Sequence, residues 1–163
     1  MKGVEHVCSS GTNEYICRIV DRYSRMLHKL ALTRLSPTDA EDVVQEVLIK
    51  LMTTLPKFRD EEHEKAWLIR ATMNRACDFR RAAAKATVPI DQLELPARED
   101  EAQLLSAVRT LPGKYSAVIH LYYYEGYSIK EIAKLLRLPA STVGSRLARG
   151  RARLKEIIKE DFE

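Results

Sequence analysis

Residues 128–155 read SIKEIAKLLRLPASTVGSRLARGRARLK, and they carry the clearest structural signal in the second half of the chain. Ser128 and Glu131 have the spacing of a capping box, in which each side chain satisfies an unpaired backbone N–H of the other's turn. Pro139 interrupts the helical pattern, and Ser141 or Thr142 can cap a new helix. The stretch therefore predicts a helix-turn-helix, two short helices joined by a tight turn.

Apolar residues at helical spacing mark the inward face of both predicted helices. They are Ile129, Ile132, Ala133 and Leu136 in the first helix, and Val143, Leu147, Leu154 and Ile158 in the second. Small residues at Ala133 and Gly144 are expected to let the two helices approach closely, although Gly144 also costs about 1 kcal/mol of helix propensity.

Positive charge gathers on the same stretch, which holds eight Lys and Arg residues against the single acid Glu131. A compact helix pair that presents a basic helix fits the major groove of duplex DNA. Nucleic acid is therefore the leading partner. The alternative is an amphipathic helical hairpin whose basic face is only solvated.

The whole chain has the composition of an ordinary globular protein. Its 163 residues are 45% hydrophobic and 31% charged, with a net charge of +4, and they suffice for one domain or two small ones. No apolar run is long enough to span a bilayer, and the first ten residues lack the apolar core of a signal peptide. We expect a cytoplasmic protein without membrane insertion.

The three cysteines, Cys8, Cys17 and Cys77, are odd in number and lack CxxC spacing. They suggest neither a disulfide framework nor a zinc site. A metal cluster of His6 with Cys8 and Cys17 is the weaker alternative. Cys17 and Cys77 are expected to lie within helices as small packing residues.

Three helices are predicted in the first half of the chain. The first covers residues 14–34, and the second begins at Ser36-Pro37 and ends at Pro56, since a capping Ser followed by Pro is a helix start. An acidic connection at 60–64 precedes a third helix from about 65 to 84. The residues of the second helix expected to face inward are Val43, Val44, Val47, Leu48, Leu51 and Leu55.

Residues 85–100 change character, because two prolines and several acids replace the helical pattern, as in a linker. Beyond it, helices are predicted at 101–110 and through Tyr124, with a stop at Gly126. The fold class is thus all-α, with two small helical domains, 1–84 and 101–163, joined by the linker 85–100.

Four carboxylates, those of Asp39, Glu41, Asp42 and Glu46, crowd two turns of the second helix with no base among them. Like charges at i and i+4, such as Asp42 and Glu46, cost a few tenths of a kcal/mol. A basic partner surface would offset that cost. The alternative is a solvated acidic face.

The third predicted helix carries the only tryptophan, Trp67, followed at helical spacing by Arg70, Asn74, Asp78 and Arg81. A single Trp is more often a core residue than a platform for stacking bases. Arginine and asparagine on a face away from Leu68 and Phe79 suit hydrogen bonds to phosphates and base edges. This helix is therefore a second candidate for contact with nucleic acid.

Three motifs in this order resemble those of the extracytoplasmic-function (ECF) RNA polymerase sigma factors of the sigma-70 superfamily. They are DAEDVVQE at 39–46, WLIRA at 67–71 with Asn74 and Asp78, and YSIKEIA at 127–133 with TVGSRL at 142–147. Each motif alone is weak, but together they cover nearly the whole chain.

The resemblance implies a role for each motif. Asp39, Asp42, Gln45 and Glu46 would bind core RNA polymerase. Trp67, Arg70, Asn74 and Arg81 would bind the minus-ten element, and Thr142, Ser145, Arg146 and Arg149 the minus-thirty-five element. The implied partners are core polymerase, promoter DNA and an anti-sigma factor, with no catalytic residue, cofactor or metal.

The sequence departs from the family pattern at three places. Residues 60–64 are unusually acidic beside the minus-ten helix, Gly144 stands where the family has Lys or Arg, and Arg137 replaces a turn glycine. Arg137 is therefore expected to adopt a glycine-like conformation at some strain.

Two other classes of function would require different features. A free-standing helix-turn-helix regulator would need neither the carboxylate helix nor the Trp67 helix. An enzyme acting on nucleic acid lacks support, because there is no Gly-rich phosphate loop, HExxH motif or paired-carboxylate metal site. The linker is either a tether or an acidic strand that occupies a polymerase channel, as the family resemblance implies.

Overall fold

The computed structural model describes residues 11–85 and 99–161, and every regular element in these ranges is an α-helix. The helices are α1 (Gly11–Leu32), α2 (Pro37–Thr54), α3 (Glu61–Lys85), α4 (Glu99–Thr110), α5 (Gly113–Tyr123), α6 (Ile129–Leu136) and α7 (Ala140–Asp161). The all-α class is confirmed. Most of the predicted linker, 86–98, lies outside the described residues.

Helices α1, α2 and α3, the first half of the molecule, share one apolar core. Ile19 and Leu27 of α1, Val43 and Leu51 of α2 and Leu68 of α3 are all fully buried there. Ser36 caps α2 as predicted, since its hydroxyl oxygen accepts from the Asp39 N–H at 3.2 Å. Leu55 was predicted to face inward, and this was wrong.

Leu55 follows the last residue of α2 and closes that helix in the left-handed conformation, with φ of 39°. Its side chain is 51% exposed, because the change of backbone direction carries it off the apolar stripe. Left-handed φ is unfavourable for a residue with a branched side chain. Pro56, next in the chain, restricts Leu55 away from the right-handed helical region, which explains why α2 ends here.

Helix α3 begins at Glu61, so the predicted acidic connection at 60–64 is in fact the start of this helix. Asp60 caps it, because one carboxylate oxygen accepts the His63 N–H at 2.7 Å. Glu61, Glu62 and Glu64 follow in the first turn, where the positive end of the helix dipole stabilises acids. Acid-rich sequence was thus misread as loop.

The helix-turn-helix forms as predicted in the second half of the molecule, α4–α7. Both hydrogen bonds of the Ser128–Glu131 capping box are present. Arg137 ends α6 with φ of 54°, the strained conformation expected of it. Val143, Leu147 and Leu154 are buried, but Ile158 is 36% exposed, so the prediction that it faces inward was wrong.

Helices α5 and α7 pack closely at Gly150, whereas the prediction for Gly144 concerned the approach of α6 and α7. A Cβ on Gly150 would lie 3.1 Å from Cγ1 of Ile119 and 3.4 Å from Cβ of Tyr115. A Cβ on Gly144 would meet nothing within 4 Å. Gly150 therefore permits the close approach of α5 and α7, and the prediction that Gly144 permits a close approach of α6 was wrong.

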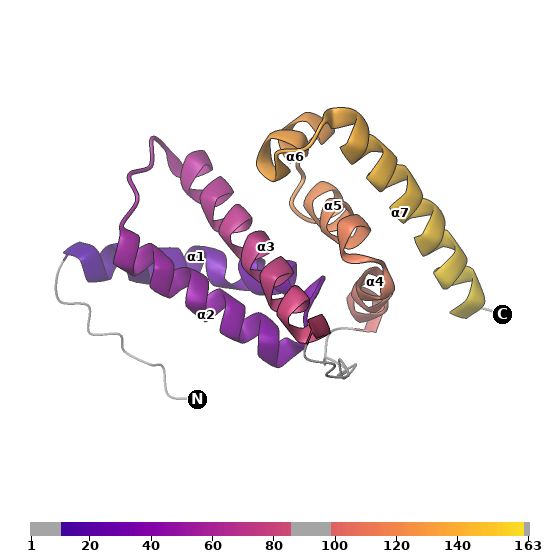
Figure 1. The fold of residues 1–163 in the computed structure, drawn as a ribbon, viewed down its shortest axis with the longest axis horizontal. Coiled ribbons are helices and arrows are strands. Elements are labelled where there is room, and N and C mark those ends of the chain that lie inside the picture. The colour runs from indigo at the N-terminus through magenta and orange to yellow at the C-terminus, as the bar shows by residue number, and fades with distance from the viewer. Residues whose placement is uncertain (1–10, 86–98, 162–163) are drawn as a thin grey trace.

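The two halves lie side by side, with α3 between α1–α2 and α5–α6 (Figure 1). Leu30, Ile69 and Met73 of the first half belong to the apolar core of the second. Polar contacts reinforce this seam: the Ser116 hydroxyl donates to the carbonyl of Thr33 at 3.1 Å, and Lys65 lies 3.8 Å from a Glu125 carboxylate oxygen.

Cys17 lies in α1 and is disulfide-bonded, contrary to the expectation of no disulfide, whereas Cys77 in α3 is a free thiol. The predicted helical placement of both is confirmed. Over residues 11–85 and 99–161, no helix combines the length and apolarity needed to cross a bilayer. The same residues hold no group of three or more His, Cys, Asp or Glu placed to bind a metal.

The two glycines of α7 give a matched test of its packing. Gly144→Ala should raise the free energy of unfolding by about 1 kcal/mol, because alanine favours a helix and has open space there. Gly150→Ala should gain clearly less, or lose stability, because its Cβ crowds Ile119. Urea denaturation of both variants measures the difference, and equal gains would contradict this account of the α5–α7 contact.

Candidate nucleic-acid and protein interfaces

The start of α7 opens onto a cavity of about 330 Å³. All four residues predicted to bind the minus-thirty-five element line it, together with two residues of α5 and one more of α7: Lys114, Tyr115, Ser141, Thr142, Ser145, Arg146 and Arg149. Hydroxyl and cationic groups thus face one hollow, which suits binding to phosphates and base edges.

The hollow is electropositive. Burial alone would raise the pKa of Tyr115, yet Lys114, Arg149 and Arg153 hold it below its ordinary value. Lys114 and Tyr115 were missed by sequence reasoning, since they lie about thirty residues before Arg146 in the chain. The break at Pro112-Gly113 was the available signal, because it places Lys114 in the first turn of a helix.

A second polar face runs along α3. Asn74 and Arg81 are exposed and Arg70 is half-buried, and Arg81 lies 3.6 Å from the carboxylate of Asp78. Trp67 is half-buried against the first-half core and meets Phe58 edge-on, with ring centroids 5.9 Å apart. The tryptophan therefore packs against the core of the first half, although it lies two turns before Asn74 on the same side of α3.

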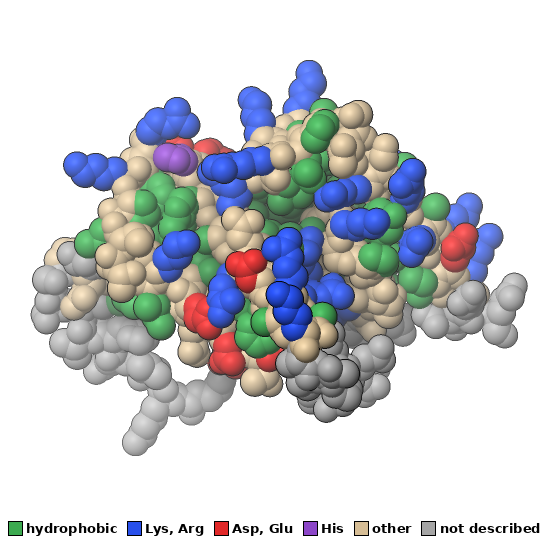
Figure 2. Space-filling view, viewed as in Figure 1, with side chains coloured by type: hydrophobic (Ala, Val, Ile, Leu, Met, Phe, Trp, Pro, Cys, Tyr) green, Lys and Arg blue, Asp and Glu red, His purple; other side chains and the backbone are tan. Residues whose placement is uncertain are grey.

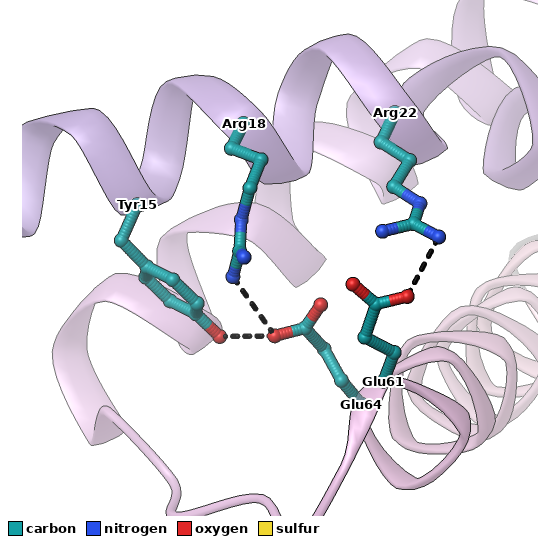
Figure 3. A network of polar contacts seen from close by, with 5 residues as sticks. All are labelled: Tyr15, Arg18, Arg22, Glu61 and Glu64. Carbon is teal, nitrogen blue, oxygen red and sulfur yellow. Dashed lines mark hydrogen bonds and ion pairs between the residues drawn. The ribbon is translucent and has the colours of Figure 1, made fainter.

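The acidic start of α3 is neutralised by α1 (Figure 3). Arg22 lies 2.8 Å from Glu61, and this contact lowers the pKa of Glu61. Buried Glu64 accepts from the Tyr15 hydroxyl at 2.9 Å and lies 3.7 Å from Arg18.

Burial, and then the hydrogen bond to Glu64, raise the pKa of Tyr15 to about 12. The tyrosine therefore stays protonated throughout the physiological pH range, and its hydroxyl donates a hydrogen bond to the Glu64 carboxylate. Glu61 and Glu64 are thus structural residues that join α3 to α1. They do not form an unpaired acidic surface beside the α3 polar face.

The acidic face of α2 is only partly free. Asp39 belongs to the helix cap, since its carboxylate accepts the Ser36 hydroxyl at 2.7 Å. Glu46 forms a bidentate pair with Arg75 of α3, one of whose bonds measures 3.1 Å. A basic surface of a partner was expected to offset the acidic charge of α2, and Arg75 of the same chain already supplies one such basic group. Asp42 and Gln45 remain exposed.

Comparison with known families places both halves in one class of protein. Residues 19–86 match Sigma-70 region 2, and residues 101–154 match Sigma-70 region 4. These two regions define an RNA polymerase sigma factor. The alternative of a free-standing helix-turn-helix regulator is not favoured, because the first half also matches.

Similarity to individual proteins identifies the kind of sigma factor. The chain is 33% identical over 145 residues to the ECF RNA polymerase sigma factor SigM of Mycobacterium tuberculosis, covering 84% of this chain and 74% of that protein. It is 32% identical over 135 residues to the RNA polymerase sigma-E factor of Streptomyces coelicolor, covering 78% and 76%. The chain belongs to the ECF sigma factors and is an alternative RNA polymerase sigma factor.

Two solved structures share the fold. The sigma factor RpoE of Bartonella quintana, in complex with the anti-sigma factor NepR, matches with a TM-score of 0.76 at 23% identity, covering 90% of this chain and 98% of that one. CnrH, in complex with the cytosolic domain of CnrY, matches with a TM-score of 0.68 at 27% identity, covering 93% and 92%.

The α1–α3 network can be tested by truncating its buried acid. Glu64→Ala should lower the free energy of unfolding by about 1–3 kcal/mol, because the Tyr15 hydroxyl loses its acceptor. Glu62→Ala, at an exposed position of the same turn, should change it by less than about 0.5 kcal/mol. Chemical denaturation compares the two, and equal effects would show that Glu64 is not a structural residue.

Proposed function

We propose that the chain binds core RNA polymerase through the exposed face of α2 and promoter DNA through α3 and α7, without a catalytic step of its own. The observation that supports this proposal is the separation of negative and positive surface charge between the two halves. Exposed Asp42 and Gln45 lie on α2, while the electropositive hollow at Arg146 and Arg149 lies on the other half. Each face suits one of the two partners that transcription initiation requires.

The polymerase contact centres on Asp42 and Gln45 in this proposal. Asp39 and Glu46 belong to the same patch, but their carboxylates are engaged by the helix cap and by Arg75. Asp39 and Glu46 therefore shape the patch, and Asp42 contributes the one carboxylate among the four assigned residues that is engaged neither by a helix cap nor by an ion pair. A protein that acts on polymerase and promoter works in the cytoplasm.

The DNA contacts divide between the halves. Arg70, Asn74 and Arg81 on α3 would contact the minus-ten element, together with Trp67 on the same side of that helix. Thr142, Ser145, Arg146 and Arg149 on α7 would enter the major groove of the minus-thirty-five element. An anti-sigma factor is the third proposed partner, supported by the two solved relatives, whose structures are complexes with NepR and CnrY.

Charge reversal tests the polymerase contact. Asp42→Lys should weaken binding to core polymerase by at least about tenfold, because it places a cation where a basic partner docks. Asp21→Lys makes the same change at an exposed position of α1 and should leave affinity within about twofold. Competition with a labelled sigma factor measures both, and unchanged binding by Asp42→Lys would refute the docking assignment.

Truncation in α7 tests the promoter contact. Arg149→Ala should weaken binding of the assembled holoenzyme to a cognate promoter by about 1–3 kcal/mol, the usual range for a base or phosphate contact. Arg25→Ala, at an exposed position of α1, is the control. Run-off transcription and affinity at several salt concentrations provide the measurement. If both variants behaved alike, Arg149 would lie outside the DNA interface.

A further inference from the structure

Three arginines from both halves converge at the start of α5. Arg34 follows α1, Arg80 lies on α3, and Arg146 lies on α7. A Cβ on Gly113, the first residue of α5, would lie 3.0 Å from Nη1 of Arg80 and 3.2 Å from Nη1 of Arg34. Burial first, and then the charges of Arg80 and Arg146, lower the pKa of Arg34.

This cluster lacks a counter-charge among the described side chains. Nη1 of Arg34 donates to Sγ of Cys77 at 2.9 Å, which is a weak acceptor, and its buried Nε has no hydrogen-bond partner. Asp78, the acid nearest in sequence to Arg80, is paired with Arg81. All three arginines are half-buried, and like charges gathered away from water without a counter-charge are unfavourable. A negative charge that the described part of the chain does not supply would therefore stabilise the site.

The positive end of α5 adds to the same field. Pro112 precedes the helix and provides no side-chain cap, so the N–H groups of Gly113 and Lys114 gain no acceptor from it. Unpaired N–H groups at a helix start favour anions. Figure 2 shows Lys and Arg side chains gathered where the two halves meet, in the middle of the view.

We infer that Arg34, Arg80, Arg146 and the first turn of α5 form an anion site that binds a free ion of the diphosphate class. Guanidinium groups match phosphate oxygens in bidentate geometry. Lys114 and Arg146 also line the neighbouring cavity of about 330 Å³, which gives room for a second phosphate group. This site has no part in the polymerase contact proposed above.

Occupancy of the site would have two consequences. Because the cations come from both halves, a bound anion would hold the halves together. Because Arg146 is also assigned to the promoter, the anion and DNA would compete for the same guanidinium group. Diphosphate would therefore favour the packed arrangement of the free protein and oppose promoter binding.

Calorimetric titration of the full chain with inorganic pyrophosphate, at constant ionic strength, tests the inference. We expect one equivalent to bind, and Arg80→Gln to weaken binding by about tenfold or more, as loss of a charged contact would. Arg25→Gln removes an exposed arginine of α1 and should leave the affinity within about twofold. No binding at millimolar pyrophosphate, or equal binding by all three proteins, would overturn the site.

Gly113→Ala tests the position of the anion without changing charge. Its Cβ would occupy the space between the Arg34 and Arg80 groups, while alanine suits the first turn of a helix. We expect weaker pyrophosphate binding with an unchanged helical circular-dichroism spectrum. Binding as tight as that of the unsubstituted chain would place the anion elsewhere and overturn the assignment.

A competition experiment with promoter DNA distinguishes a free anion from the DNA backbone as the source of phosphate. Pyrophosphate should displace a labelled promoter duplex from the unsubstituted chain at a lower concentration than from Arg80→Gln, measured by fluorescence anisotropy. If Arg80→Gln instead weakened duplex binding while pyrophosphate gave no heat, the cluster would be a DNA-backbone contact. The proposal of a free anion would then fail.

Discussion

Helix α3 buries two faces in two different cores and thereby joins the two halves of the molecule. Leu68 lies in the core of the first half, whereas its neighbour Ile69 lies in the core of the second. One residue along a helix turns the side chain by about 100°, so a single helix can serve both cores. Met73 repeats the contact of Ile69 one turn later.

The double burial determines what α3 can offer to a partner. With two faces packed, the remaining face carries Arg70, Asn74 and Arg81, spaced so that they share one side of the helix. Arg80 instead shares the side of Ile69 and Met73, which explains why its guanidinium group reaches the seam and the start of α5. One helix thus positions both the proposed minus-ten contacts and part of the anion site.

Local signals in the sequence predicted the helix-turn-helix well. The helix starts and stops set by Ser128, Glu131 and Pro139 depend only on residues close by in the chain. They can therefore be predicted without knowledge of the tertiary fold. The start of α3 was misplaced because acids suit both a loop and the positive end of a helix, and the capping role of Asp60 was not recognised. The candidate residues of α7 also cluster as the sequence indicated.

Contacts between distant segments could not be predicted in this way. The charges of Arg22 and Arg75 were visible, but a charge does not specify its partner, and only the fold brings them to Glu61 and Glu46. The burial of Leu30, Ile69 and Met73 against the second half likewise depends on how the two halves dock. An apolar stripe indicates that a face is buried without indicating what covers it.

Packing of the halves bears directly on the proposed function, because Arg146 of α7 lies close enough to Arg34 of the first half to lower its pKa. Thr142 and Arg146 are half-buried, whereas Ser145 and Arg149 are exposed. A major groove that engages all four residues requires the start of α7 to be uncovered. A ligand shifts an equilibrium only through its difference in affinity for the two states. Polymerase would therefore favour the uncovered state if it bound the protein with separated halves more tightly than the protein with packed halves. The apolar contacts of Leu30, Ile69 and Met73 set the free energy that this difference has to exceed.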